Sequence, residues 1–270
     1  MSKRNSQSAK TAARERLRQE RERQAQRAKV RRQLTVAGAV VAVLAAAGGI
    51  GYAVVQANKP AHWEAAKDDK LVKPAHASGA NGTTVLIGKS DAKKTLVMYE
   101  DPRCPICSTF EQAVGPTVKK GLDAGKFKIQ YVGATFLDKG MGGEGSKNAL
   151  SALGAALNVS PEAFLEYKSA MYAKKWHPAE TTDKFKDDSY LIEIADTVPA
   201  LKGNAAFRKD VRDGTFDRWA LDESEIFDKD GISGTPTLKM DGKVLTGADG
   251  KNAPMTAQEF DTALAAALKG

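Results

Sequence analysis

The sequence predicts an α/β domain that follows one transmembrane helix. A strand-like apolar run at Leu96–Tyr99 leads to the segment Cys104–Cys107 (Cys-Pro-Ile-Cys), which begins a helix, and a second strand-like run follows that helix. Further along the chain, a proline-containing segment precedes a β-hairpin and a closing helix. An uncharged stretch at 34–55 is long enough to cross a bilayer.

Positive charge is concentrated in the first 33 residues. They contain 12 of the 41 Lys and Arg residues and three of the 33 Asp and Glu residues, so the rest of the chain has 29 basic and 30 acidic residues. A nucleic-acid-binding domain would carry its basic patch on the folded part. We therefore expect no nucleic-acid partner, and we interpret residues 1–33 as a basic cytoplasmic tail, either solvated or attracted to anionic lipid headgroups.

The stretch Leu34–Val55 contains 22 residues and no charge. As a helix it would be roughly 33 Å long, enough to span the hydrocarbon core. Most of the flanking basic residues precede it, which predicts a single-pass cell-membrane protein with a cytoplasmic N-terminus and an extracytoplasmic domain. Cleavage as a signal peptide after Ala57 is the alternative. We favour an uncleaved signal anchor, because the apolar stretch and the basic region are both long for a signal peptide.

Residues 56–82 are rich in Ala, Lys, Pro and Gly. This composition predicts a linker between the membrane and a domain at 83–270. Trp63 within the linker has two interpretations, an anchor at the membrane interface or a side chain that docks on the domain.

The first half of the domain alternates strands with a helix. Thr83–Ile87, Leu96–Tyr99 and Phe127–Val132 are rich in β-branched and apolar residues, which favour strands. Cys104–Leu122 repeats apolar residues at a spacing of four, which predicts a helix. The order strand–helix–strand over about 35 residues is typical of a right-handed parallel βαβ unit.

The second half begins with a predicted helical insertion at about 144–227. Within it, Ser160-Pro161 is a strong helix start, with a Ser cap and a Pro at the first helical position. Residues 237–246 predict a hairpin around Asp241-Gly242, a pair that suits a type I′ turn. Thr256–Glu259 is a capping box that opens the closing helix.

Cys104 and Cys107 are the only cysteines in the chain. A thiol at the start of a helix meets unpaired backbone N–H groups and the positive end of the helix dipole, which favour the thiolate. Cys107 lies about one helical turn further on, within reach of a disulfide. The pattern indicates thiol–disulfide exchange. A purely structural disulfide is the weaker interpretation, because it would close only a short loop and restrict the unfolded chain little. A metal site would have only two ligands here, so we expect no metal, and we expect no other cofactor.

A second unusual segment, Ile232–Leu238 (Ile-Ser-Gly-Thr-Pro-Thr-Leu), stands directly before the hairpin. A proline that enters a strand cannot donate to the ladder, so it requires an edge, a bulge or a cis bond. Such a turn also leaves a backbone edge free to pair with an extended peptide.

These paired motifs resemble the DsbA-like thiol–disulfide oxidoreductases of the thioredoxin superfamily, over roughly 83–268. The resemblance implies a thioredoxin fold, with the helical insertion between the βαβ half and the cis-proline and hairpin half. It implies that Cys104 is the nucleophile and Cys107 the resolving cysteine. It also implies that Pro236 is the cis-proline and that Thr235 contacts the substrate.

The chain departs from the family pattern in two places. Family oxidants often carry a His between the cysteines, whereas Pro105 and Ile106 stand here. Many relatives carry a buried acid six residues before the first cysteine, where this chain has Met98. Proton transfer from Cys107 would then depend on water, Glu100 or Asp101. Arg103 either favours the thiolate or is only a solvated charge.

The resulting prediction is an extracytoplasmic, membrane-anchored oxidoreductase that donates its disulfide to exported proteins. An exported disulfide reductase and a redox-silent peptide-binding module are the alternatives. The expected partners are exported proteins with thiols or disulfides and a membrane redox partner, and the chain is expected to be a monomer.

Overall fold

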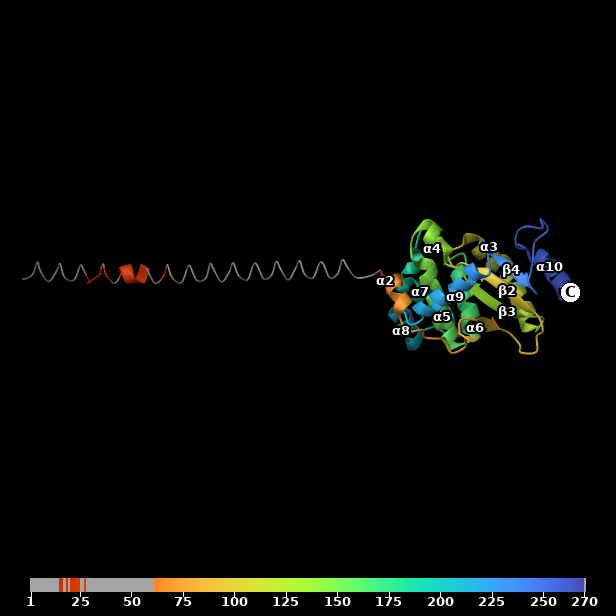
Figure 1. Ribbon diagram of the computed structural model, residues 1–270, viewed down its shortest axis with the longest axis horizontal. Helices are drawn as coiled ribbons and strands as arrows, with labels where there is room; N and C mark the ends of the chain where they lie inside the picture. The colour runs from red at the N-terminus through yellow and green to blue at the C-terminus, as the bar shows by residue number, and fades with distance from the viewer. Residues whose placement is uncertain (1–14, 17, 19, 25–26, 28–60, 270) are drawn as a thin grey trace, which may run out of the picture. The chain divides into compact units, whose positions relative to one another are not determined.

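The computed structural model describes residues 15–16, 18, 20–24, 27 and 61–269 (Figure 1). The chain divides into two units, 1–61 and 62–270, and the residues described between 15 and 27 are helical. The predicted membrane span at 34–55 lies outside the described residues. Among the residues that are described, no helix is long and apolar enough to cross a membrane.

The second unit contains five strands and a larger set of helices. The strands are β1 (Val85–Ile87), β2 (Thr95–Glu100), β3 (Lys128–Gly133), β4 (Thr237–Met240) and β5 (Lys243–Val244). The α-helices are α2 (His62–Ala65), α3 (Pro105–Asp123), α4 (Phe136–Met141), α5 (Gly145–Val159), α6 (Pro161–Tyr172), α7 (Asp188–Ala195), α8 (Ala205–Asp213), α9 (Asp217–Lys229) and α10 (Ala257–Lys269). Two short 3-10 helices are η1 (Ala66–Asp68) and η2 (Lys184–Lys186).

The strands form one sheet in the order β1-β3-β2-β4-β5. Only β2 and β3 pair in parallel, with Thr95 opposite Lys128 and Glu100 opposite Gly133, and the other neighbours are antiparallel. Helix α3 connects the two parallel strands, as the sequence predicts. The mixed sheet with its helices is the architecture that the family resemblance implies.

Each face of the sheet has its own packing. One face presents Leu96 and Met98 to the buried side chains of α3, including Phe110 and Val114, because alternate strand residues point to the same side. The opposite face presents Tyr99 and Val132 to Phe227 of α9. Figure 1 shows the helices gathered around the sheet.

The helical insertion lies between β3 and β4 and is longer than the predicted 144–227. It starts with α4, at Phe136, and ends with α9, at Lys229. Helix α4 has a weak sequence signal because it is one short run that includes Gly140. Its stability comes from burial of Leu137 and Asp138 against the rest of the molecule. The predicted start of α6 is confirmed, since Ser160 Oγ accepts a hydrogen bond from the backbone N–H of Ala163 at 3.0 Å.

The predicted hairpin and the closing helix are both confirmed. Asp241 and Gly242 have φ of 51° and 76°, the left-handed conformation that a type I′ turn requires at both positions. Thr256 and Glu259 exchange hydrogen bonds at 3.2 Å in each direction at the start of α10.

The predicted linker is wrong from His62 onwards, because this part of the chain packs on the domain. Trp63 is only 5% exposed, so docking on the domain is the correct interpretation of its role. The indole N–H of Trp219 donates to the carbonyl of Gly82 at 2.9 Å, and His62 Nε2 lies 2.7 Å from Asp217 Oδ2. The sequence of this segment does not reveal its packing, because the residues that it contacts lie far along the chain.

Candidate active site

The turn between β2 and α3 places the first cysteine at the helix start. Cys104 is the N-cap of α3, with extended backbone angles (φ −71°, ψ 118°), and Pro105 follows at the first helical position. The backbone N–H of Cys107 donates to Cys104 Sγ at 3.4 Å. The N-terminal backbone donors of α3 are therefore aimed at the sulfur that would carry charge.

The second predicted motif lies against the first. The Thr235–Pro236 peptide bond is cis, as the resemblance implies. In its protonated form, Cys104 donates from Sγ to the carbonyl oxygen of Thr235 at 3.6 Å. Residues 131 positions apart in the chain thus meet because β4 pairs with β2, the strand that ends before the cysteines. All four residues singled out in the sequence lie at this one site.

The two thiols have opposite electrostatic environments. The pKa of Cys104 is lowered to about 6, chiefly by hydrogen bonding from Cys107 and further by Thr235 and the backbone N–H groups of Ile106 and Cys107, against an opposing effect of burial. Cys107 is fully buried, and burial raises its pKa well above the usual value, with the hydrogen bond to Cys104 and the charge of Glu100 acting in the same direction. At neutral pH, Cys104 is a thiolate and Cys107 a thiol.

A buried cluster of charged side chains lies beside the cysteines. Lys168 of α6 donates to Glu100 Oε2 at 3.0 Å and to Glu111 Oε2 at 2.6 Å. Glu100 is 1% exposed, and burial raises its pKa to about 7, although the cationic Lys168 opposes this. The sequence offers Glu100 as one candidate proton donor or acceptor for Cys107. It gives no signal for Lys168 or Glu111, because Lys168 lies 68 residues from Glu100 and 57 residues from Glu111 along the chain.

The carboxylate of Asp101, the other candidate acid, is occupied by hydrogen bonds that stabilise the active-site turn. Its carboxylate accepts hydrogen bonds from Ser146 Oγ at 2.7 Å, from the Arg103 N–H at 2.9 Å and from the Leu137 N–H at 3.2 Å. In contrast, Glu100 Oε1 is buried and has no hydrogen-bond partner among the described residues. Glu100 is therefore the acid with a free oxygen near Cys107.

Arg103 is not a solvated charge. It is 3% exposed, and its guanidinium donates to Asp138 Oδ1 and to the Gly142 carbonyl, both at 2.9 Å, and to the Glu180 carbonyl at 3.3 Å. These partners all belong to the helical insertion. The side chain thus ties the turn before Cys104 to the insertion.

The described residues contain no group of three or more His, Cys, Asp or Glu side chains that could hold a metal ion. The site consists of two sulfurs, a cis-proline loop and a buried acid.

Comparison with known proteins identifies this arrangement. Residues 80–266 match the thioredoxin family model. The chain belongs to the thioredoxin family. Disulfide bond formation protein D of Bacillus subtilis is 26% identical over 161 residues, which cover 59% of this chain and 68% of that protein.

Two further comparisons extend the similarity. The structure of reduced DsbA from Mycobacterium tuberculosis superposes with a TM-score of 0.54 at 26% identity, covering 69% of this chain and 100% of that one. Serine/threonine-protein kinase PknE of Mycobacterium tuberculosis is 26% identical over 167 residues, 60% of this chain. The match spans only 29% of the kinase. With the Cys104–Cys107 pair in place, the relatives named for disulfide formation make this chain a thiol–disulfide oxidoreductase.

Proposed function

We propose that this oxidoreductase donates a Cys104–Cys107 disulfide to exported proteins. The observation that carries the proposal is the stabilised Cys104 thiolate, with a pKa of about 6. A stabilised thiolate stabilises the reduced enzyme, so the disulfide form is a strong oxidant. The relative named for disulfide bond formation supports the same direction of electron flow.

The proposed reaction has two exchange steps. A substrate thiolate attacks Cys104 Sγ, a new S–S bond forms, the Cys104–Cys107 bond breaks, and its electron pair leaves on Cys107. A second substrate thiolate then attacks the substrate sulfur of the mixed disulfide, and Cys104 leaves as a thiolate. The substrate is oxidised by two electrons and the enzyme is reduced by two. Cys104 is the sulfur attacked in the first step because Cys107 is fully buried, and Cys104 leaves readily in the second step because its lowered pKa makes its thiolate a good leaving group.

Cys107 requires a proton when it leaves, because its raised pKa disfavours the thiolate. We assign Glu100 as the donor, since its free oxygen is buried and its pKa of about 7 lies near neutral pH. Thr235 and Pro236 are assigned to substrate contact, because the Thr235 carbonyl already lies beside Cys104 Sγ.

The reduction potential tests the direction of electron flow. The purified full-length chain should equilibrate with glutathione at a potential well above that of thioredoxin, about −270 mV. A value at or below that of thioredoxin would favour the reductase. Cys104→Ser should abolish exchange, and full function of that variant in the cell would leave only the redox-silent peptide-binding module.

The location outside the cytoplasm and the membrane anchor are part of the proposal. The uncharged stretch 34–55 and the 12 preceding basic residues support an anchor with its N-terminus in the cytoplasm. Alkaline carbonate should leave the protein with the membranes, and protease added to spheroplasts should digest the domain. Release of the domain by carbonate would instead support cleavage after Ala57.

A membrane redox partner is proposed to reoxidise Cys104 and Cys107, because each turnover leaves the enzyme reduced. The chain is proposed to act as a monomer. Crosslinking of the Cys107→Ala variant in membranes should trap both exported substrates and this partner as mixed disulfides with Cys104.

A further inference from the structure

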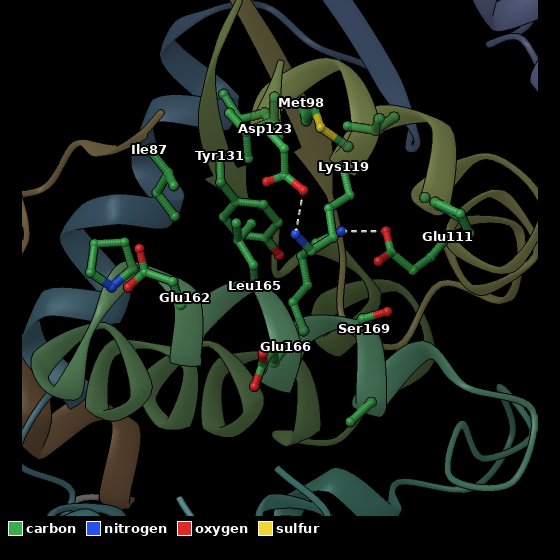
Figure 2. Close-up of a pocket in the computed structure, with 18 of the residues that line it drawn as sticks. Ile87, Met98, Glu111, Lys119, Asp123, Tyr131, Glu162, Leu165, Glu166 and Ser169 are labelled. Atoms are coloured by element: carbon green, nitrogen blue, oxygen red, sulfur yellow. Dashed lines mark hydrogen bonds and ion pairs between the residues drawn. The ribbon is translucent and has the colours of Figure 1, made fainter. Parts of the chain in front are cut away.

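A groove beside one face of the sheet is lined by residues of both α3 and α6. Its volume is about 1090 Å³, and Figure 2 shows Leu165 and Ser169 contributed by α6 and Glu111 contributed by α3. Ala173, directly after α6, also lines the groove. Its neighbour Tyr172 is the last residue of α6, and this residue connects the two helices by direct hydrogen bonds.

The backbone carbonyl of Tyr172 accepts two hydrogen bonds from α3. Ser108 Oγ donates to it at 2.7 Å and Gln112 Nε2 at 2.9 Å. A carbonyl at the end of a helix has no partner within that helix, so the side chains of α3 supply the missing donors. The end of α6 is thereby fixed to the first turns of the helix that begins at the cysteines.

The side chain of Tyr172 reaches the segment that precedes the cysteines. Its hydroxyl donates to the Asp101 carbonyl at 3.1 Å, and the same carbonyl accepts the backbone N–H of Cys104 at 2.9 Å. The second of these bonds closes the four-residue turn that leads from β2 to α3. The ring is buried in the same apolar cluster as Cys104 and Cys107. Tyr172 therefore holds the acceptor of the turn that places Cys104.

His177 adds a second contact to the same turn. Its Nε2 lies 3.1 Å from the Pro102 carbonyl, and this nitrogen donates because a carbonyl can only accept. The imidazole stacks on the Tyr172 ring, with centroids 5.8 Å apart and an interplanar angle of 24°. Burial lowers the pKa of His177, which favours the neutral ring at neutral pH. One pair of stacked rings thus holds two neighbouring carbonyls of the turn, those of Asp101 and Pro102.

We propose that Tyr172 and His177 are positioning residues for exchange at Cys104, because together they hold the turn that keeps Cys104 Sγ at the N-terminus of α3. The inference rests on the proposed exchange reaction and holds for either direction of electron flow. Both residues act through the backbone of the turn. The helical insertion thereby sets how strongly the disulfide oxidises.

The sign of the effect follows from what holds the sulfur in each redox state. In the reduced protein, Cys104 Sγ accepts the backbone N–H of Cys107 at 3.4 Å, and such a bond weakens steeply with misalignment. A turn freed from Tyr172 would let the sulfur move away from this donor. In the disulfide, the S–S bond itself holds Cys104 next to Cys107. A loosened turn therefore destabilises the thiolate more than the disulfide, and the disulfide becomes a weaker oxidant.

The test measures the equilibrium of the purified full-length chain with reduced and oxidised glutathione at pH 7. Tyr172→Phe removes the hydroxyl and keeps the ring. It should lower the equilibrium constant for reduction of the disulfide by glutathione about fivefold, the equivalent of one hydrogen bond. The midpoint of the thiolate ultraviolet absorbance should rise by the same factor, about 0.7 pH units, with Cys104→Ser as the blank.

Tyr167→Phe is the matched control on the same helix. Tyr167 is also buried, and its hydroxyl donates to the carbonyl of Leu191, on α7, at 2.9 Å. Each variant loses one buried bond from a hydroxyl to a backbone carbonyl, so urea denaturation should show similar losses of unfolding free energy. Only Tyr172→Phe should change the glutathione equilibrium and the absorbance midpoint.

His177→Phe removes the second contact and keeps a stacked ring. It should shift the equilibrium constant in the same direction as Tyr172→Phe. The inference is overturned if Tyr172→Phe folds and keeps the wild-type constant, or if Tyr167→Phe shifts it by the same factor. Should Tyr172→Phe fail to fold, an unchanged constant in His177→Phe overturns the inference instead. If the wild-type protein does not exchange with glutathione at all, the proposed function itself fails.

Discussion

At the residue scale, the two sulfurs differ in what surrounds them. Cys104 Sγ receives the backbone N–H of Cys107 and lies at the positive end of α3, whereas Cys107 is enclosed and faces the charge of Glu100. A chemical difference between two identical side chains, one helical turn apart, thus follows from burial and hydrogen bonding. Within the uncharged pair Pro105-Ile106, the backbone N–H of Ile106 helps to lower the pKa of Cys104, and neither side chain is a donor.

Alkylation kinetics should display this difference directly. Cys104 in the reduced protein should react with iodoacetamide with a half-maximal rate near pH 6, because its pKa is lowered to about 6. Cys107 should remain unreactive up to pH 9. Mass spectrometry of labelled peptides distinguishes the two sites, and Cys107→Ala is the control for a single thiol. Equal rates at both cysteines would contradict the assigned roles.

Thr235→Val tests the contribution of one hydroxyl. Thr235 Oγ1 is buried and has no hydrogen-bond partner among the described residues, so its hydroxyl is free to donate to Cys104 Sγ once that sulfur is charged, which lowers the pKa of Cys104. Its loss should raise the pKa of Cys104 by about one unit, the equivalent of one hydrogen bond. The ultraviolet absorbance of the thiolate against pH measures this value. Thr237→Val, whose hydroxyl donates to the Gly234 carbonyl, should leave it unchanged.

Residues that carry their own chemistry were predictable from the sequence. Cys104, Cys107, Thr235 and Pro236 stand in short motifs whose spacing indicates one site. Lys168 was not predictable, because an isolated lysine on a helix has no local signal that distinguishes a buried ion pair from a solvated charge. Its role depends on how α6 packs against α3, which no short stretch of sequence encodes.

At the element scale, the insertion and the βαβ half are joined at the active-site turn. Tyr172 at the end of α6 donates to the Asp101 carbonyl at 3.1 Å, and His177 Nε2 lies 3.1 Å from the Pro102 carbonyl. Arg103 and Asp138 form a buried ion pair in the same place. The helical insertion therefore positions the cysteines in addition to covering the sheet.

Arg103→Met should show how much the contacts between the insertion and the active-site turn contribute to the free energy of unfolding. Asp138 would remain buried without its closest cation, and breaking a buried ion pair costs about 3–5 kcal/mol of unfolding free energy. Urea denaturation of the 62–270 fragment measures the loss. The control is Arg208→Met, because the Arg208–Asp196 pair is about one-third exposed and screened by solvent, so its loss should lower the unfolding free energy far less. Similar losses for both variants would contradict a structural role for the Arg103 junction.

The regular elements of the core were easier to predict than their connections. β2, α3 and the hairpin follow hydrophobic periodicity and turn chemistry, so their predicted bounds are close to the observed ones. Helix α4 escaped prediction because six residues cannot establish a helical period, and its helix depends on tertiary contacts.

At the scale of the whole molecule, the boundary of the domain lies earlier than the sequence predicts. The segment from His62 to Gly82 adds a buried indole, a hydrogen bond to Trp219 and the contact between His62 and Asp217. Domain boundaries are inferred from composition, whereas stability depends on the area that each segment buries. Ala- and Lys-rich stretches can therefore belong to a core through one large side chain.

Truncation measures how much the segment from His62 to Gly82 stabilises the domain. A fragment that begins at residue 83 should unfold at lower urea than the 62–270 fragment, because it lacks Trp63 and leaves the indole N–H of Trp219 without its acceptor. Burial of one large aromatic side chain and one buried hydrogen bond together predict a loss of about 4 kcal/mol. Trp63→Ala in the longer fragment should reproduce most of it, about 3 kcal/mol. Equal midpoints for the two fragments would restore the linker interpretation, since a linker contributes no buried surface to the folded state.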